Sequence, residues 1–198
     1  MFKMAGCAFV LLLLLCAFFA SCSSVSAFEK MRKDASVTVE LSNLYRNNDD
    51  RDGELNTLLS FAEQYSLTAD PQVAYNLAVR YYEDKEYGKA LDICIPCIDA
   101  YKAHSRFRKL ACSCHIALGD YGKAWEMYDS ILDSGEAITE KDVLQMCAFI
   151  DEHSIPEGKK KVIETAMKNG LFTKDILTIA AEMNPDEDEY DMLLRYAK

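Results

Sequence analysis

Cysteine is the residue type in this sequence with the clearest potential for chemistry. Cys94 and Cys97 form one close pair, and Cys112 and Cys114, followed directly by His115, form another. Thiolate and imidazole ligands at such short spacings suit a tetrahedral zinc ion. One hypothesis is therefore a metal- or small-ligand-binding protein that uses the Cys94, Cys97, Cys112 and Cys114 cluster or a cavity among its helices.

The competing interpretation is that these thiols are packed core residues. Cys94 and Cys97 follow Ala90 at spacings of four and three residues, which places three small side chains on one face of a helix. A buried cysteine behaves as a small hydrophobic residue. We favour this interpretation and expect no metal and no cofactor, while a disulfide between Cys97 and Cys112 stays open.

One polar segment imitates the start of a calcium-binding loop. Oxygen-bearing side chains at Asn48, Asp50 and Asp52 precede Gly53, as they do in an EF-hand. The twelfth position, where such a loop has a bidentate glutamate, is Leu59. The segment is therefore predicted to be a polar turn whose acidic residues lie at the N-terminus of the next helix.

The sequence lacks the residue patterns of common enzymes. There is no G-x-S-x-G elbow, phosphate-binding loop or H-E-x-x-H motif, and the three histidines, His104, His115 and His153, are scattered. We therefore predict that the protein is not an enzyme. Its formal net charge of -10 also disfavours nucleic acid as a partner, because proteins that bind nucleic acid present basic surfaces.

The elements that carry these residues repeat along the chain. The segment 86–91 reads EYGKAL, and the segment 120–125, thirty-four residues later, reads DYGKAW. A period of thirty-four residues is that of a helical hairpin array. Upstream of the first copy an amphipathic helix is predicted over 72–84, because its apolar residues follow the spacing i, i+3, i+4 and i+7 at Ala74, Leu77, Ala78 and Tyr81.

These features resemble the tetratricopeptide repeat (TPR), a pair of packed helices joined by a tight turn. The clearest repeats cover residues 71–104 and 105–138. Periodicity and helix-start signals predict further helices, which cover residues 37–47, 53–65, 139–152, 156–168, 173–183 and 186–198. The resemblance implies an all-α, TPR-like solenoid of about three to four helical hairpins over residues 36–198, with atypical end units.

In the TPR family the first helices of successive hairpins line a concave groove that holds another protein. The matching positions of this chain predict a protein-binding groove made of Tyr75, Asn76, Val79, Tyr82, Arg106, Lys109 and Ser113. TPR domains that clamp a carboxylate use lysine and asparagine where this chain has Tyr75 and Val79, so that specialised function is not implied. For each residue the alternative is packing against a flanking hairpin.

The N-terminus predicts export. Lys3 precedes an apolar run over 8–20, which is too short to span a bilayer comfortably. The string FASC at 19–22 resembles a bacterial lipobox, which implies a signal peptide over 1–21 and lipid attachment at Cys22.

After lipidation, residues 22–35 are predicted to form a flexible tether. The alternative is ordinary cleavage near Ala27, which would release a soluble secreted protein.

These expectations combine into a non-catalytic TPR lipoprotein that acts as a protein–protein interaction adaptor or assembly factor in the bacterial cell envelope. The expected partners are another envelope protein or peptide segment, and a membrane through lipidated Cys22. The expected location is lipid-anchored and periplasm-facing, with Ser23 favouring the outer membrane. A separate possibility is self-association through an exposed apolar end of the stack.

Overall fold

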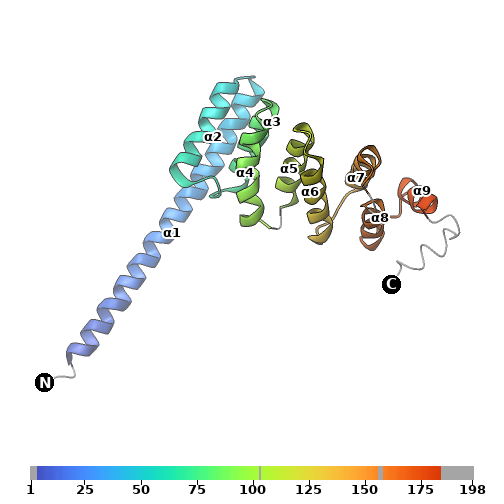
Figure 1. The fold of residues 1–198 in the computed structure, drawn as a ribbon. Coiled ribbons are helices and arrows are strands. Elements are labelled where there is room, and N and C mark those ends of the chain that lie inside the picture. Colours follow the sequence, from blue (N-terminus) through green and yellow to red (C-terminus); the bar gives the residue numbers. More distant parts are fainter. Residues whose placement is uncertain (1–3, 103, 156–157, 184–198) are drawn as a thin grey trace. The chain divides into compact units, whose positions relative to one another are not determined.

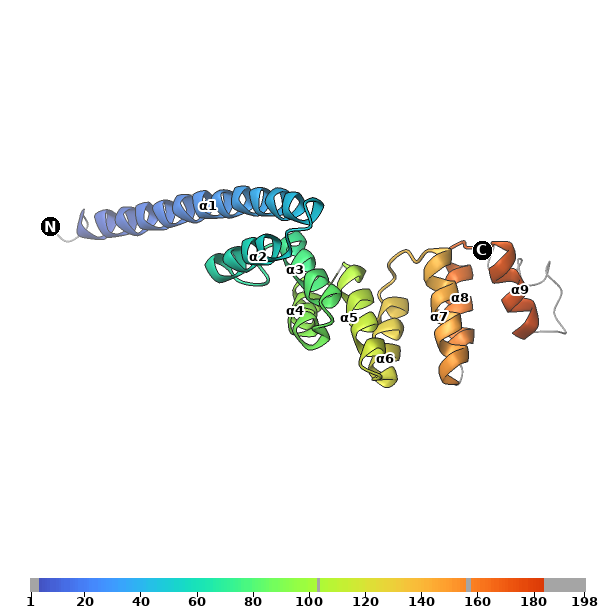
Figure 2. The ribbon, with the colours of Figure 1, turned by 90° about the horizontal axis from the view of Figure 1, so that it is seen from above.

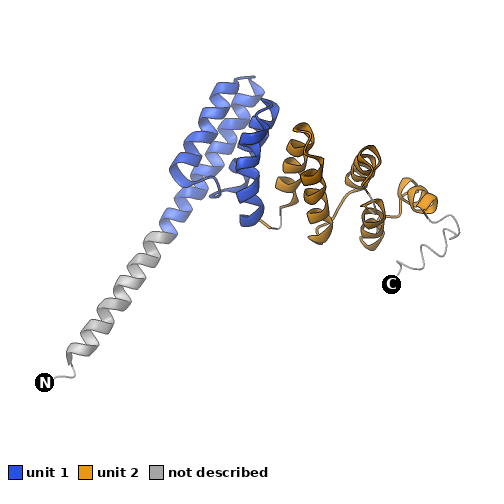
Figure 3. Cartoon of the chain, viewed as in Figure 1, with its two compact units in different colours: residues 1–100 blue, residues 101–198 orange. Residues whose placement is uncertain are grey.

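The computed structural model describes the backbone of residues 4–102, 104–155 and 158–183, and the side chains within these ranges from residue 25 onward. All regular secondary structure in these residues is helical. The chain divides into two compact units, Met1–Ala100 (unit 1) and Tyr101–Lys198 (unit 2) (Figure 3). Adjacent helices pack in pairs within each unit, which confirms the prediction of an all-α, TPR-like fold.

Unit 1 contains two helical hairpins. The first pairs α1 (Met4–Asn47) with α2 (Arg51–Tyr65), and the second pairs α3 (Pro71–Glu83) with α4 (Tyr87–Ala100). Helix α3 packs against both α1 and α2, so the two hairpins are stacked (Figures 1 and 2). The core of the unit is apolar and includes Leu58, Phe61, Val73, Leu77 and Ile93.

In its described residues, unit 2 contains two further hairpins and one additional helix. The hairpins are α5 (Ser105–Ala117) with α6 (Tyr121–Asp133), and α7 (Glu140–His153) with α8 (Gly158–Lys168). Helix α8 also packs on α6, and α9 (Lys174–Met183) packs on α7 and α8. The predicted helix over 186–198 lies outside the described residues.

The packing of α8 on α6 depends on a glycine. A Cβ atom added to the buried Gly158 would lie 3.1 Å from Trp125 of α6 and 3.2 Å from Ile150 of α7. Both distances are tighter than ordinary van der Waals contact, so the missing side chain lets three helices approach closely. Gly158 is therefore a packing position.

The thirty-four-residue repeat reappears in the geometry of the turns. The Glu86 N–H donates to the Tyr81 carbonyl (2.9 Å), and thirty-four residues later the Asp120 N–H donates to the His115 carbonyl (2.8 Å). Each bond closes the end of a helix in the manner of a Schellman motif, which requires one residue in the left-handed region. That residue is Lys85 (φ 62°) in the first copy and Gly119 (φ 75°) in the second.

Polar caps fix where the helices begin. Thr139 and Asp142 form a capping box at the start of α7. The Asp50 carboxylate caps α2 by accepting a hydrogen bond from the Gly53 N–H (2.9 Å). This bond confirms that the segment resembling a calcium loop is a polar turn with an acidic residue at the next helix start.

The segment predicted to be a flexible tether is different in the structure. The described backbone of residues 22–35 is helical and continues into the rest of α1. The physical reason is that no glycine or proline occurs between residues 22 and 47 to interrupt the helix. Side chains over 25–30 are exposed, whereas Ala35 is buried.

The membrane predictions rest on residues whose side chains the structure does not describe, including Cys22. Within the part of the chain that is described in full, no helix combines the length and the apolar character needed to cross a bilayer.

Candidate protein-binding surfaces

Helix α3 of unit 1 carries four of the residues predicted for the groove. The Asp70 carboxylate starts this helix by accepting from the Gln72 and Val73 N–H groups (2.8 and 3.0 Å), and Pro71 occupies its first turn. Apolar residues such as Leu77 form its buried face. The opposite side carries the predicted residues Tyr75, Asn76, Val79 and Tyr82, all of which are half-buried.

Part of this α3 surface is engaged within unit 1. The Asn76 amide donates weakly to the Ser42 hydroxyl of α1 (3.5 Å) and accepts from the Gln72 amide (2.8 Å). The Tyr82 ring lies 5.4 Å from the ring of Tyr87 on α4, measured between centroids. The alternative of packing against neighbouring elements therefore applies to Asn76 and Tyr82.

Helix α5 of unit 2 carries the other three predicted residues. Arg106, Lys109 and Ser113 lie at i, i+3 and i+7, so they share one face, and all three are half-buried. The Ser113 hydroxyl donates to the Lys109 carbonyl (3.0 Å), so this hydroxyl is hydrogen-bonded within its own helix.

Lys109 is held in place by α7. Its Nζ lies 2.7 Å from Oδ1 of Asp142, the residue that also completes the capping box of α7. Burial opposes ionisation of Asp142, but the Lys109 ammonium and the hydrogen bonds from Thr139 outweigh it and lower the pKa of the carboxyl below its ordinary value. Lys109 therefore links two hairpins of unit 2.

The described surface also contains a charged pocket that the sequence did not predict. It lies in unit 1, has a volume of about 290 Å³, and is lined by Arg46, Asp49, Arg51, Glu54, Arg80 and Glu83. Arg46 contacts Glu54 (2.7 Å) and Glu83 (3.2 Å), and Arg51 lies 3.5 Å from Asp84. Since its guanidinium groups already have carboxylate partners, the pocket is unsuited to binding an anion.

Glu54 and Arg80 form the buried part of this network. Glu54 is 1% exposed and Arg80 is 4% exposed, and their nearest charged atoms are 3.6 Å apart. Arg80 also donates from Nε to Asp84 (2.9 Å), which is the main reason that its pKa is raised above the ordinary value. The network joins α1, α2 and α3, so its evident role is to hold the hairpins of unit 1 together.

A shallow pocket in unit 2 also lies outside the predicted groove. Its volume is about 480 Å³, and its lining comes from α7 and α9: Glu140, Lys141, Leu144, Gln145, Ala148 and Asp175.

The cysteines are core residues, as predicted. Cys94, Cys97, Cys112, Cys114 and Cys147 are all buried thiols. Burial raises the pKa of Cys112 to about 12 and that of Cys114 to about 11. Because the thiolate is the form that binds a metal, these shifts act against metal binding. Among the residues described, no group of three or more histidine, cysteine or acidic side chains is arranged to hold a metal ion.

His115 is also a packed residue. It is 7% exposed, and burial lowers the pKa of its imidazole although the Asp120 carboxylate, 3.9 Å away, opposes that change. Its place in the core agrees with a packing role.

Solved structures have a similar fold over part of this chain. One of them is described as the first TPR of Spaghetti (RPAP3) bound to HSP90 peptide SRMEEVD, and it matches with a TM-score of 0.54. The fold is TPR-like. The match covers 62% of this chain and 97% of that chain at 16% sequence identity, so it establishes the fold alone. The sequence matches no protein-family model and no curated protein.

Proposed function

We propose that this TPR-like chain is a non-catalytic protein-interaction module. The observation that carries the proposal is a set of half-buried side chains on α3 of unit 1 and a separate set on α5 of unit 2, each the first helix of its hairpin. The similar RPAP3 domain is described as bound to an HSP90 peptide, which supports a peptide or protein partner for this chain. Tyrosine and arginine are the residue types that dominate such interfaces.

The contacts within each unit narrow the chemistry of the partner. Lys109 is paired with Asp142, and the Asn76 and Ser113 side chains have partners within their own units. A segment bound to α3 would therefore meet mainly the aliphatic side chain of Val79. Such a surface fits a peptide or helix that binds through apolar side chains better than a partner that binds through charged groups alone.

The proposed setting is the bacterial cell envelope, where the chain acts as an adaptor or assembly factor. The lipobox-like string ending at Cys22 supports lipid attachment there, with the folded part facing the periplasm. Envelope proteins or peptide segments are then the partners. Incorporation of a labelled fatty acid into the native chain, lost in Cys22→Ser, would support the anchor. Equal labelling of both chains would contradict it.

Photo-crosslinking in intact cells tests the binding surface. A photoreactive amino acid would replace Val79 on α3 or Ser113 on α5 in the full chain. The matched controls are Glu63 on α2 of unit 1 and Glu126 on α6 of unit 2. Both are exposed and lie on the second helix of a hairpin. We expect one protein to be captured from Val79 and Ser113 and not from the controls.

Two results would contradict the proposal. One is the absence of any captured protein at Val79 and Ser113, and the other is capture of the same species from all four positions. Proteins identified from the first two positions alone would also show whether the partner resides in the envelope.

A further inference from the structure

The described part of α1 carries an apolar stripe on its outer side. Val37, Leu41 and Leu44 lie at i, i+4 and i+7, which places them on one face of the helix. They are 46%, 41% and 55% exposed, respectively. We call these three residues the α1 stripe.

The opposite face of α1 makes the contacts with unit 1, and its side chains are smaller. Ala35, Thr38 and Ser42 lie at i, i+3 and i+7 and are all buried. The helix therefore turns a small-residue face toward its own unit and leaves its larger aliphatic side chains in solvent. A terminal helix of a repeat array that has no partner is expected to be polar on its outer face.

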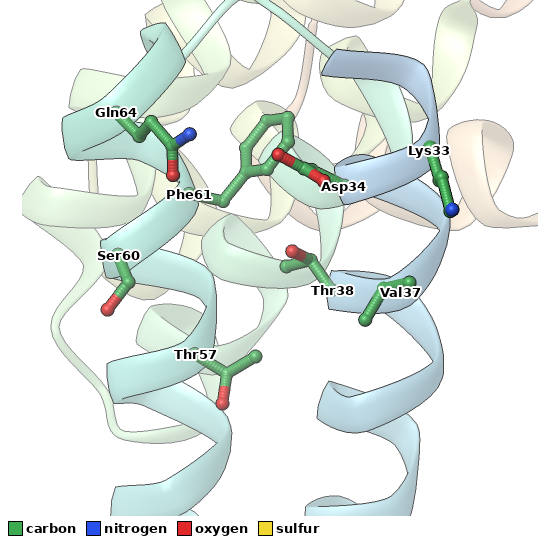
Figure 4. A pocket seen from close by; sticks show the side chains of 8 residues that line it. All are labelled: Lys33, Asp34, Val37, Thr38, Thr57, Ser60, Phe61 and Gln64. Carbon is green, nitrogen blue, oxygen red and sulfur yellow. The ribbon is translucent and has the colours of Figure 1, made fainter. Parts of the chain in front are cut away.

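A groove runs beside the α1 stripe. It lies between α1 and α2, has a volume of about 390 Å³ and is lined in part by Val37, Thr38 and Phe61. Figure 4 shows Phe61 and Thr38 pointing into this groove from the two helices, whereas Lys33 points away from it. A side chain from a second helix lying on the stripe has room to enter the groove.

The two ends of the stripe carry opposite charges. Lys30 and Lys33 precede it, and Asp49 and Asp52 follow it. Neither lysine has an ion pair among the residues that the structure describes. The Asp49 side chain is 94% exposed and lies 3.9 Å from Arg51, a contact at the limit of an ion pair. Asp34 lies next to Lys33 but accepts a hydrogen bond from the Tyr65 hydroxyl of α2, so it is engaged within unit 1.

This pattern is self-complementary. Lys33 precedes Leu41 by eight residues within α1, which is about 12 Å along the helix at 1.5 Å per residue. Asp49 follows Leu41 by eight residues and lies in the turn just after α1 ends at Asn47. An antiparallel pair of α1 helices that cross at Leu41 would bring Lys33 of each copy close to Asp49 of the other. Val37 would then lie opposite Leu44.

We propose that the α1 stripe is the interface of a symmetric, antiparallel homodimer. In such an isologous contact the same patch of both copies meets itself, which suits a stripe with one basic and one acidic end. The apolar residues supply the buried area and the charged ends set the direction of pairing. This proposal concerns unit 1 and does not depend on the peptide-binding role of α3 and α5.

Engineered cysteines in the full chain, oxidised in intact cells, test the geometry. We expect Leu41→Cys to form a disulfide-linked dimer with itself. Val37→Cys and Leu44→Cys should cross-link much better with each other, in cells that express both, than either does alone. The unmodified chain and Glu63→Cys are the controls, because they report cross-linking through the native cysteines and through an exposed position on α2.

Charge reversal tests the direction of pairing by an independent readout. Lys33→Glu should reduce the yield of the Leu41→Cys dimer at least severalfold, and adding Asp49→Lys to the same chain should restore it. Both substituted residues are exposed, and an unchanged circular dichroism spectrum would confirm that the variants fold.

Three outcomes would overturn the proposal. Leu41→Cys chains that remain monomeric would exclude the dimer, and a cross-link from Leu41→Cys to a different protein would assign the stripe to another partner. Equal self-cross-linking at Val37→Cys, Leu41→Cys and Leu44→Cys would indicate parallel helices and refute the charge argument.

Discussion

The buried ion-pair network of unit 1 leads to a quantitative prediction. Glu54→Gln keeps the shape of the side chain and removes its charge. Both bonds from Arg46 end on Glu54 Oε1, at 2.8 Å from Nε and 2.7 Å from Nη2. A glutamine oxygen can still accept them, but as a neutral acceptor.

The expected cost follows from the partners that remain. A hydrogen bond to a charged group contributes roughly 1.5–3 kcal/mol and a neutral one roughly 0.5–1.5 kcal/mol. Removing one member of a fully buried pair costs about 3–5 kcal/mol. Arg80 keeps Asp84 and Glu83, and Arg46 is partly exposed, so we expect a smaller loss. The free energy of unfolding should fall by about 2 kcal/mol.

Urea denaturation followed by far-ultraviolet circular dichroism measures this loss. With a denaturant slope of about 2 kcal/mol per molar, the midpoint should fall by about 1 M. The matched control is Glu63→Gln, which removes an exposed carboxylate from the same helix and should change stability by less than about 0.5 kcal/mol.

Fluorescence adds a second readout. Trp125, the only tryptophan, lies in unit 2, so it separates unfolding of that unit from loss of helix in the whole chain. A midpoint shift for Glu54→Gln no larger than that for Glu63→Gln would refute a stabilising role for the network.

Two further predictions concern a turn and an ion pair. Lys85→Gly should raise the free energy of unfolding by about 0.5–1 kcal/mol, because glycine adopts the left-handed conformation of residue 85 without strain. Gly119→Ala at the matching turn should lower the free energy of unfolding. Thermal melting measures both changes. Lys109→Met should cost about 1 kcal/mol at pH 7. Because the pKa of Asp142 in the fold lies below its ordinary value of 3.8, its stabilising contribution is present above pH 3.8 and is lost as the pH falls through the lowered value. Urea titrations at pH 7 and pH 3 should therefore show the difference between the native chain and Lys109→Met shrinking in acid, and an unchanged difference would contradict the role of this pair.

Local patterns in the sequence were sufficient to predict the hairpins. Apolar spacing gave the helix over 72–84, which the structure places at Pro71–Glu83, and helix-start signals gave the helix over 139–152, which it places at Glu140–His153. The repeat at thirty-four residues predicted two equivalent turns, and their hydrogen bonds agree to 0.1 Å. These features depend on residues close together in the chain, which is why periodicity and capping rules reveal them.

The buried charges could not be predicted in the same way. Glu54 was expected to be part of a polar turn at a helix start, and nothing near it in the sequence indicates a partner. A usable signal was Arg80, which lies at i+7 from Val73 and i+3 from Leu77, on the buried face of α3. An arginine on an apolar face requires a carboxylate nearby, but which carboxylate is decided by the packing of α1 and α2 on α3.

The contacts of the predicted groove residues could not be predicted from local sequence either. Family resemblance selects positions on α3 and α5 that face away from the core of each hairpin, and they do lie half-buried. It does not reveal that Lys109 reaches Asp142 of the next hairpin or that Asn76 reaches Ser42 of the preceding one. Such contacts come from stacking, so the chemical character of the surface could be read only after the hairpins were assembled.

Helix α1 shows how a correct helix assignment can still leave its orientation open. Two faces of its hairpin segment qualify as packing surfaces, one with Val37, Leu41 and Leu44 and the other with Ala35, Thr38 and Ser42. Hydrophobicity alone favours burying the first, yet the structure buries the second. The small face lets the backbones of α1 and α2 approach closely. The larger aliphatic side chains therefore stay exposed, where the proposed second copy of α1 can contact them. A helix that buried its aliphatic face inside unit 1 would have no such side chains on its surface.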